Sequence, residues 1–181
     1  MAVDFTALQA TVRERFAEQV LDWTEFRGQA CLHLRRERVV DVMRFLRDDA
    51  SVRFAMLSDV TAVDLLKHPE ADKWPERFAV VYQLYSLEHN ARLQVKAYVP
   101  EVPCETPSVA ELWSAANWGE REAYDMYGIR FTGHPDLRRI LMPDTYEGYP
   151  LRKDYPLKGR GERDNFPKYT EIPEEGRGGK V

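Results

Sequence analysis

The sequence predicts an α+β fold in which helices cover a mixed or antiparallel sheet in two layers, followed by an extended C-terminal tail. Apolar residues recur at three- and four-residue steps in two N-terminal segments, which indicates helices, and alternate with polar residues in others, which indicates strands. Residues 1–118 contain one glycine and five prolines, whereas residues 119–181 contain fifteen of the two together. Because regular elements tolerate neither residue well, we expect a domain over residues 1–128 and a tail over 129–181.

The first half of the domain is predicted to be a helix, a hairpin and a second helix. Asp4 is an expected N-cap, and one apolar stripe follows it: Phe5, Leu8, Val12, Phe16 and Val20. Two short strands, Leu21–Phe26 and Gln29–Arg35, come next, and Arg27-Gly28 between them suits a tight turn. A second apolar stripe at helical spacing begins at Val39.

The second half is predicted to contribute three strands and a helix. The strands are expected at Phe54–Val63, Arg77–Leu87 and Arg92–Val99, and the last alternates strictly between apolar and polar residues. Residues 108–111, with the sequence SVAE, form a capping box that predicts the start of a helix, and Gly128 is well placed as its C-cap. The order is therefore α-β-β-α-β-β-β, then helix and tail, as expected of an α+β layer.

Composition excludes several classes of protein. The chain has 26 basic and 30 acidic residues, a net charge of −4, so a strongly basic nucleic-acid binder is not expected. Its two cysteines, Cys31 and Cys104, are far apart, which argues against zinc ribbons, cysteine-ligated iron–sulfur clusters and disulfide scaffolds. The longest uncharged stretch, Phe78–Leu87, has ten residues, about half of a membrane span. We expect a soluble protein of a reducing compartment.

The tail is unlike an ordinary disordered linker. From Glu120 onward the chain keeps eight of its 21 aromatic residues, and 12 basic residues balance 12 acidic ones. Solvated linkers are poor in aromatic residues. We therefore interpret the tail as a ribbon that lies on the surface of another protein, and we expect it to be mobile from Gly133 onward in the isolated chain.

Residues 119–144 contain the densest group of candidate functional side chains. A metal or acid–base site would use Glu120, Glu122, Asp125 and His134, but two carboxylates and one distant histidine are not a specific ligand pattern. Arg121 and Asp125 are four residues apart and can pair on one helix face. A solvated, salt-bridged helix face is the simplest alternative. Charges of both signs among tyrosine, methionine and phenylalanine favour a partner-binding surface.

Two motifs carry a resemblance to a known family. The first covers residues 120–141 and contains ERE, YDMYGI, GHPDLR and IL; the second is GYPLRKDYPL at residues 148–157. Upstream, Asp59 with Asp64, RFAVVY at residues 77–82 and the tryptophans of LW and NW at 112–118 also fit. Over about residues 55–157 the chain resembles the 30 kDa (C) subunit of proton-pumping NADH–quinone oxidoreductase, which is respiratory complex I.

The resemblance implies a structural and assembly role. The 30 kDa subunit of that complex binds no flavin, iron–sulfur cluster or quinone; FMN and the clusters are held by partner subunits. It packs in the peripheral arm beside the quinone-site (D) subunit and near iron–sulfur subunits, on the cytoplasmic face of the membrane. The complex passes electrons from NADH to quinone and pumps protons. Contact with the membrane would be only indirect, through the complex, and no nucleic-acid partner is implied.

The motif residues are then candidates for a partner interface rather than for catalysis. The candidate interface residues are Glu120, Arg121, Glu122, Asp125, His134, Asp136, Arg138, Arg139, Arg152, Asp154 and Tyr155. Two alternatives remain. Equivalent subunits occur in membrane-bound hydrogenase and reduced-deazaflavin dehydrogenase complexes, and a stand-alone hydrolase could use the carboxylates of Glu120, Glu122 and Asp125. No catalytic, cofactor-binding or metal-binding residue is assigned in this chain.

Overall fold

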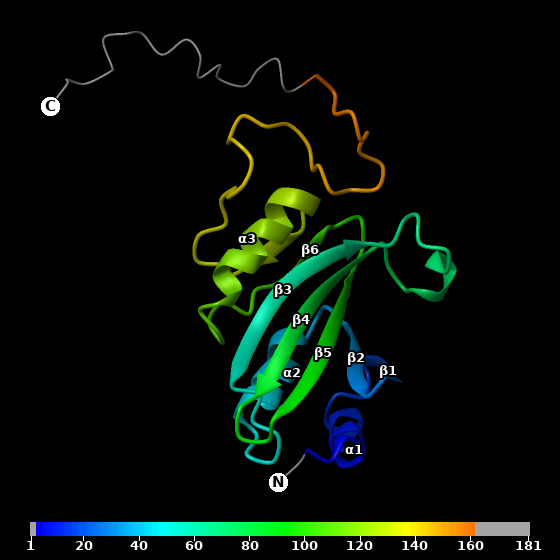
Figure 1. The fold of residues 1–181 in the computed structure, drawn as a ribbon, viewed down its shortest axis with the longest axis vertical. Coiled ribbons are helices and arrows are strands. Elements are labelled where there is room, and N and C mark those ends of the chain that lie inside the picture. The colour runs from blue at the N-terminus through cyan, green and yellow to red at the C-terminus, as the bar shows by residue number, and fades with distance from the viewer. Residues whose placement is uncertain (1–2, 162–181) are drawn as a thin grey trace, which may run out of the picture.

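A five-stranded mixed sheet with helices packed against one face forms the centre of the fold (Figure 1). The computed structural model describes residues 3–161. Its elements are α1 (Phe5–Arg15), β1 (Val20–Phe26), β2 (Gln29–Arg35), α2 (Val39–Asp48), β3 (Met56–Asp64), the short 3₁₀ helix η1 (Ala71–Lys73), β4 (Phe78–Ser86), β5 (Ala91–Val99), β6 (Glu105–Pro107), α3 (Ala116–Tyr127) and β7 (Arg130–Thr132). The predicted α+β class is confirmed.

The strand order is β1-β2-β5-β4-β3, with β2 and β5 parallel and the other neighbours antiparallel. The alternation predicted for β5 places Leu93, Val95, Ala97 and Val99 in the core. That core also contains buried residues of all three α-helices, such as Val12 of α1. The helices therefore bury one face of the sheet, and within residues 3–161 a smaller apolar cluster that includes Trp74 of the β3–β4 connection packs on the other face.

Local signals in the N-terminal half predict the structure well. The Asp4 carboxylate accepts hydrogen bonds from the backbone N–H groups of Thr6 and Ala7, as an N-cap does. Arg27 and Gly28 both have positive φ, 52° and 77°, the conformation of a two-residue hairpin turn that follows the strand twist. The first apolar stripe does not remain helical to Val20, because that residue already begins β1.

The predicted capping box is wrong, because no helix begins at Ser108. The Ser108 hydroxyl instead accepts a hydrogen bond from the Ala110 N–H and donates one to the Glu120 carboxylate, at 3.1 and 2.5 Å. Turns follow, and α3 begins only at Ala116. Two short parallel strands, β6 and β7, were not expected; β7 pairs beyond Gly128 and extends regular structure past the predicted domain boundary.

Close packing of α3 on β3 explains the glycine inside the helix. A Cβ atom at Gly119 would lie 2.7 Å from the Val60 carbonyl oxygen and 2.8 Å from the Val60 Cβ. Gly119→Ala should therefore destabilise the protein by about 1–3 kcal/mol, although alanine is the better helix former. Urea unfolding of the two proteins measures the effect. A variant as stable as the natural protein would contradict this account of the packing.

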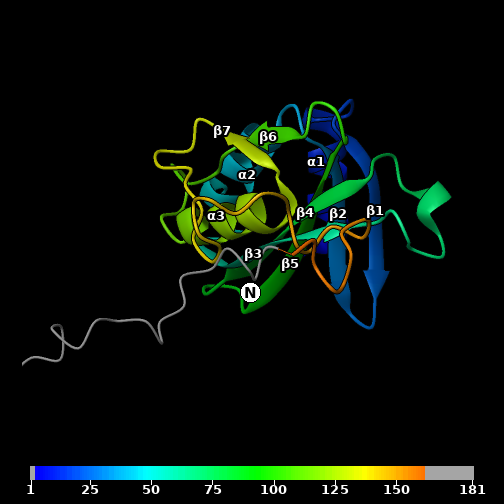
Figure 2. The same cartoon turned by 90° about the horizontal axis from the view of Figure 1, so that it is seen from above.

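The chain after β7 has no helix or strand up to residue 161, and it runs over α3 and back toward the sheet (Figure 2). Phe166 and Tyr169, two of the aromatic residues on which the prediction of a partner-bound tail rests, lie outside the described residues. No helix within residues 3–161 is long and apolar enough to span a membrane.

Candidate functional site: a charged clasp between α3 and the following segment

Helix α3 contains charged side chains that are buried. Glu120 and Asp125 are fully buried and Arg121 is 9% exposed. A buried charge without a partner costs several kcal/mol, so each of these groups must be paired or hydrogen-bonded. Their partners come mainly from the segment that follows β7, and we call this set of contacts the α3 clasp: Arg121 and Asp125 with residues 138–142.

Asp125 is the centre of the α3 clasp. Its Oδ2 accepts hydrogen bonds from the consecutive backbone N–H groups of Ile140, Leu141 and Met142 at 2.7–3.0 Å. Its Oδ1 lies 2.5 Å from the guanidinium of Arg139. Burial alone would raise the pKa of Asp125, but these hydrogen bonds hold it below its ordinary value. The carboxylate thus remains charged and fixes the backbone of the following loop.

Arg121 contacts the same loop from the preceding turn of α3. Its Nε donates to the Arg138 carbonyl oxygen at 3.1 Å, and its Nη2 donates to the Arg139 carbonyl oxygen at 3.2 Å. Its guanidinium also lies 4.9 Å from the centre of the Trp118 ring. The predicted pairing of Arg121 with Asp125 along the helix is replaced by contacts in which each binds the loop.

The C-terminal end of α3 is covered by residues of the second motif. Gly128 is a left-handed C-cap with φ of 75°, as predicted, and the Tyr149 ring occupies the space where a Cβ would lie. The Arg152 guanidinium stacks 4.7 Å from the Tyr149 ring and donates to the Tyr127 carbonyl oxygen at 2.6 Å. This cation satisfies a carbonyl that the helix leaves unpaired at its negative end.

A second ionic group lies where the second motif meets the sheet, and we call it the Arg77 cluster. Arg77 donates to Asp64 at 2.8 Å, to Asp154 at 2.9 Å and to Glu101 at 2.6 Å. The side chain of Asp64 is fully buried and also accepts from the Lys153 N–H at 2.8 Å. Burial would raise the pKa of Asp64, but the bonds from Arg77 and Lys153 lower it.

Glu120 is also fully buried, but it binds residues that precede α3. Its carboxylate accepts from the Val109 N–H at 2.7 Å and from the Ser108 hydroxyl. Nε2 of the buried His134 lies 4.0 Å from it and within 3.2 Å of the Asn117 carbonyl oxygen. Burial raises the pKa of Glu120 to about 7, against the opposing effect of its hydrogen bonds.

The raised pKa of Glu120 predicts a stability that depends on pH near neutrality. The folded chain keeps this proton up to about pH 7, whereas the unfolded chain releases it near the ordinary pKa of 4.5. The free energy of unfolding should therefore fall as pH rises between these two values. Glu120→Gln keeps the shape of the side chain without the titration. We expect urea unfolding from pH 5 to 8 to show a loss of about 2 kcal/mol in the natural protein and a flatter profile in the variant. Parallel profiles would contradict this.

The remaining candidate residues are mostly at the surface. Glu122 is exposed and Asp136 pairs with the exposed Arg138 at 2.7 Å. The Tyr155 hydroxyl bonds to the Tyr146 hydroxyl at 2.7 Å. The structure therefore brings one group of candidate residues together at α3: Arg121, Asp125, Arg138 and Arg139. A second group lies at the other end of the segment: Arg152, Asp154 and Tyr155. Whether these residues also contact a partner stays a prediction.

The metal and acid–base alternative finds no geometric support in the described chain. Glu120 points into the interior, Asp125 binds the following loop and Glu122 faces solvent, so the three carboxylates do not converge. Within residues 3–161, no group of three His, Cys, Asp or Glu side chains is arranged to hold a metal ion.

Sequence reasoning missed the role of Arg77. Asp64 ends β3 and Arg77 precedes β4, and the antiparallel register sets Asp64 opposite Phe78. Two oppositely charged residues at the same end of neighbouring strands are therefore the signal that could have found the pair.

The fold and the α3 clasp together define an α+β domain in which the segment after β7 is fixed to the last helix by a buried ion pair and by hydrogen bonds to the backbone. The sequence model of the family described as respiratory-chain NADH dehydrogenase, 30 kDa subunit, matches residues 32–161. The chain therefore belongs to this family, which confirms the expectation from the two motifs.

Several relatives and solved structures agree with this assignment. The C subunit of NADH-quinone oxidoreductase from Geobacter sulfurreducens is 49% identical over 82% of this chain and 87% of its own length. The corresponding protein from Roseiflexus castenholzii is 46% identical over 87% of each chain. A trypsin-resistant fragment (residues 1–134) of Nqo5 is 38% identical, with a TM-score of 0.61, over 72% of this chain and 98% of the fragment.

A chain of an archaeal membrane-bound sulfane sulfur reductase has a TM-score of 0.68 over 97% of this chain and 95% of that chain. At 20% identity it shows that the fold is shared and no more. The matches at higher identity support the NADH–quinone oxidoreductase family rather than the hydrogenase, deazaflavin dehydrogenase or hydrolase alternatives.

Proposed function

We propose that this chain is a non-catalytic component of the peripheral arm of NADH–quinone oxidoreductase, at the cytoplasmic face of the membrane, and that it helps to assemble and hold the quinone-reducing module. Its neighbours would be the quinone-site subunit and the adjacent iron–sulfur subunits. Family membership supports the complex, and the α3 clasp supports the structural role. The observation that carries the proposal is that the buried charges of the first motif bind backbone groups of the same chain.

A catalytic carboxylate would need access to a substrate. The carboxylate of Asp125 instead accepts four hydrogen bonds and is fully buried, and that of Asp64 is bound by Arg77 and a backbone N–H. Groups held in this way stabilise a conformation and present it to other proteins. The exposed residues of the same motifs, such as Glu122 and Arg138, remain the proposed contacts with the quinone-site subunit.

Purification of the tagged chain from membranes in a mild detergent tests the proposal. We expect the quinone-site and iron–sulfur subunits to co-purify, with NADH–quinone turnover in the preparation. A chain that purifies alone would contradict the proposal. If a hydrogenase or deazaflavin-dehydrogenase module co-purifies instead, the electron donor of the complex is not NADH.

The proposal also predicts that the chain has no cofactor of its own. The sequence has neither a cysteine cluster nor a phosphate-binding glycine loop, so the purified recombinant chain should be colourless and lack stoichiometric iron or flavin. Absorbance spectroscopy and metal analysis check this expectation. A chromophore at about one per chain would contradict it.

A further inference from the structure

A groove crosses one end of the sheet face that the helices do not cover, beside the β3–β4 connection. A cavity of about 370 Å³ lies between the β1–β2 hairpin and the β3–β4 connection, and a second of about 190 Å³ continues it toward the loop after β5. Leu21, Pro75 and Tyr98 line both cavities, so the two form one groove. We call it the Tyr98 groove. It lies apart from the α3 clasp, on the opposite face of the sheet.

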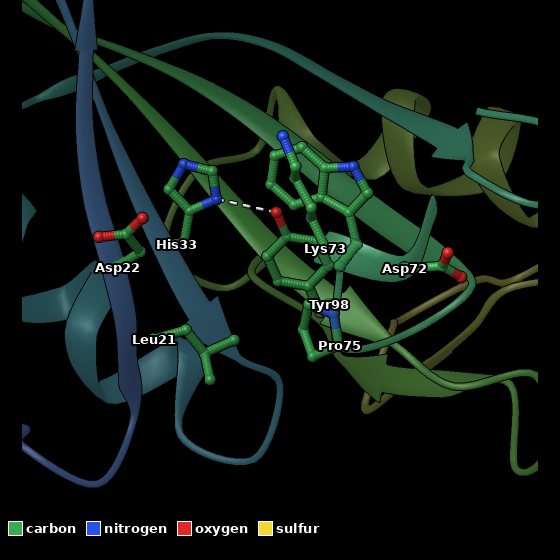
Figure 3. A pocket seen from close by; sticks show the side chains of 8 residues that line it. Leu21, Asp22, His33, Asp72, Lys73, Pro75 and Tyr98 are labelled. Carbon is green, nitrogen blue, oxygen red and sulfur yellow. Dashed lines mark hydrogen bonds between the residues drawn. The ribbon is translucent and has the colours of Figure 1, made fainter. Parts of the chain in front are cut away.

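The floor of the Tyr98 groove is aromatic and fixed. The His33 ring lies nearly parallel to those of Trp74 and Tyr98, with centroids 5.7 and 5.9 Å away. His33 Nδ1 bonds to the Tyr98 hydroxyl at 2.8 Å, as Figure 3 shows, and its Nε2 bonds to the Thr24 hydroxyl at 2.9 Å. Because these bonds hold the His33 and Tyr98 rings in place, this part of the floor can accept an apolar group without rearrangement.

The walls of the groove carry carboxylates on both sides. Asp22 projects from β1 and Asp72 from the β3–β4 connection, with Tyr98 between them (Figure 3). Neither makes an ion pair within residues 3–161. Lys73 of the first cavity is paired with Glu70, and the nearby Lys96 lies over the Trp74 ring, 5.8 Å from its centre. The second cavity is lined by charges of both signs, Arg35, Arg36, Glu37 and Glu76, and Arg36 donates to the carbonyl oxygens of Pro103 and Glu105. The first cavity therefore offers two carboxylates to a positive charge.

The shape of the groove favours an extended chain. Three prolines lie along it beside the aromatic floor: Pro75, which lines both cavities, and Pro100 and Pro103, which line the second. Grooves lined by aromatic side chains can bind extended peptide segments. β1 borders the groove and is an edge strand, so its outer backbone groups have no strand partner within the described part of the chain.

We propose that the Tyr98 groove binds an extended segment of a neighbouring protein in the complex, with an apolar side chain over Tyr98 and Pro75 and a lysine or arginine beside Asp22 or Asp72. The inference rests on the proposed function, because it requires that other subunits surround this chain. Charge complementarity selects the basic residue, and the aromatic floor adds an attraction for a cation that passes over it.

Site-specific photo-crosslinking tests the inference in the assembled complex. Benzoylphenylalanine is introduced at Lys73 of the tagged full-length chain, the complex is purified and irradiated, and the cross-linked peptides are identified by mass spectrometry. We expect one extended segment of another protein of the complex that contains a lysine or arginine. The same probe at Asp59, which is exposed on β3 at the opposite edge of the sheet, is the matched control and should give another segment or none.

Charge reversal then tests the role of the two carboxylates. The double variant Asp22→Lys with Asp72→Lys should lower the cross-linking yield at position 73 by about tenfold or more, because like charges repel across a contact. Replacing the basic residue of the cross-linked segment by glutamate should restore it. An unchanged yield in the double variant would overturn the charge-based part of the proposal.

The outcomes separate this inference from the proposed function. If the complex co-purifies intact but position 73 gives no cross-link, the groove is open and only this inference fails. A cross-link to residues 162–181 of the same chain, or to a segment without a basic residue, also overturns it. If no other protein of the complex co-purifies with the tagged chain, the proposed function fails, and this inference with it.

Discussion

Asp125→Asn should lower the stability of the isolated chain by about 3 kcal/mol or more. The substitution keeps the size of the side chain but removes the charge that holds the Arg139 guanidinium and three backbone N–H groups, and its amide nitrogen would face donors. Breaking a buried ion pair by removing one partner typically costs about 3–5 kcal/mol. Urea unfolding measures the loss, and hydrogen exchange should show faster exchange at residues 140–142.

The pH dependence of unfolding gives a second signature for Asp125. Because the folded pKa is lower than the ordinary value, this carboxylate stabilises the fold above about pH 4 and loses that effect as pH falls through its folded pKa. The difference between the natural protein and Asp125→Asn should therefore shrink in acid. A difference that stays constant down to about pH 2 would contradict the assigned ion pair.

Glu122→Gln is the matched control, since Glu122 is on the same helix but exposed. It should change the stability of the isolated chain by less than about 0.5 kcal/mol. In cells, both variants should lower the amount of assembled complex more than the turnover of each complex that forms. Asp125→Asn would do so by destabilising the fold, and Glu122→Gln by removing a contact with a partner subunit. A loss of turnover by about 10²–10⁴-fold at normal assembly would instead indicate acid–base catalysis.

Local sequence signals predicted most of the fold. The cap at Asp4, the turn at Arg27-Gly28 and the strict alternation of β5 depend on neighbouring residues alone, and the structure contains all three. The capping box at Ser108 failed for a tertiary reason. Its hydroxyl has a better partner in the buried carboxylate of Glu120, twelve residues away, and no helical N–H competes with that bond.

The candidate site was harder to predict because its geometry depends on contacts far apart in the sequence. The motif at residues 120–141 was recognised as unusual, but spacing along one helix suggested that Arg121 pairs with Asp125. The structure pairs each with the loop 14–18 residues later, a contact that no helical periodicity encodes. The prolines of this segment prevent a helix, and its backbone N–H groups are instead satisfied by a carboxylate.

The same contacts argue against the expectation that the isolated chain is mobile from Gly133 onward. Composition shows that the segment cannot form a core of its own, but it does not show which surface the segment covers. Residues 138–154 are bound to α3 and the sheet of the same chain through Asp125, Arg152 and Arg77. Slow hydrogen exchange of this stretch in the isolated chain is the result that now follows from the structure.

Arg77→Met should have an effect as large as that of Asp125→Asn. Methionine fills similar space but leaves the fully buried Asp64 without its cation, and it releases Asp154 from the sheet. We expect a loss of about 3–5 kcal/mol in the free energy of unfolding. Hydrogen exchange should also rise at residues 152–155, because the Lys153 N–H loses a carboxylate that is held in place.

Two further variants separate the two consequences of losing Arg77. Asp154→Asn removes only the half-exposed partner of Arg77, so it should cost less than about 1 kcal/mol yet still loosen residues 152–155. Arg77→Met combined with Asp64→Asn removes both buried charges and should recover part of the stability lost in the single variant, since no unpaired charge remains buried. If the double variant is as unstable as the sum of the two single ones, Arg77 stabilises the fold through its packing on Phe78 rather than through its charge.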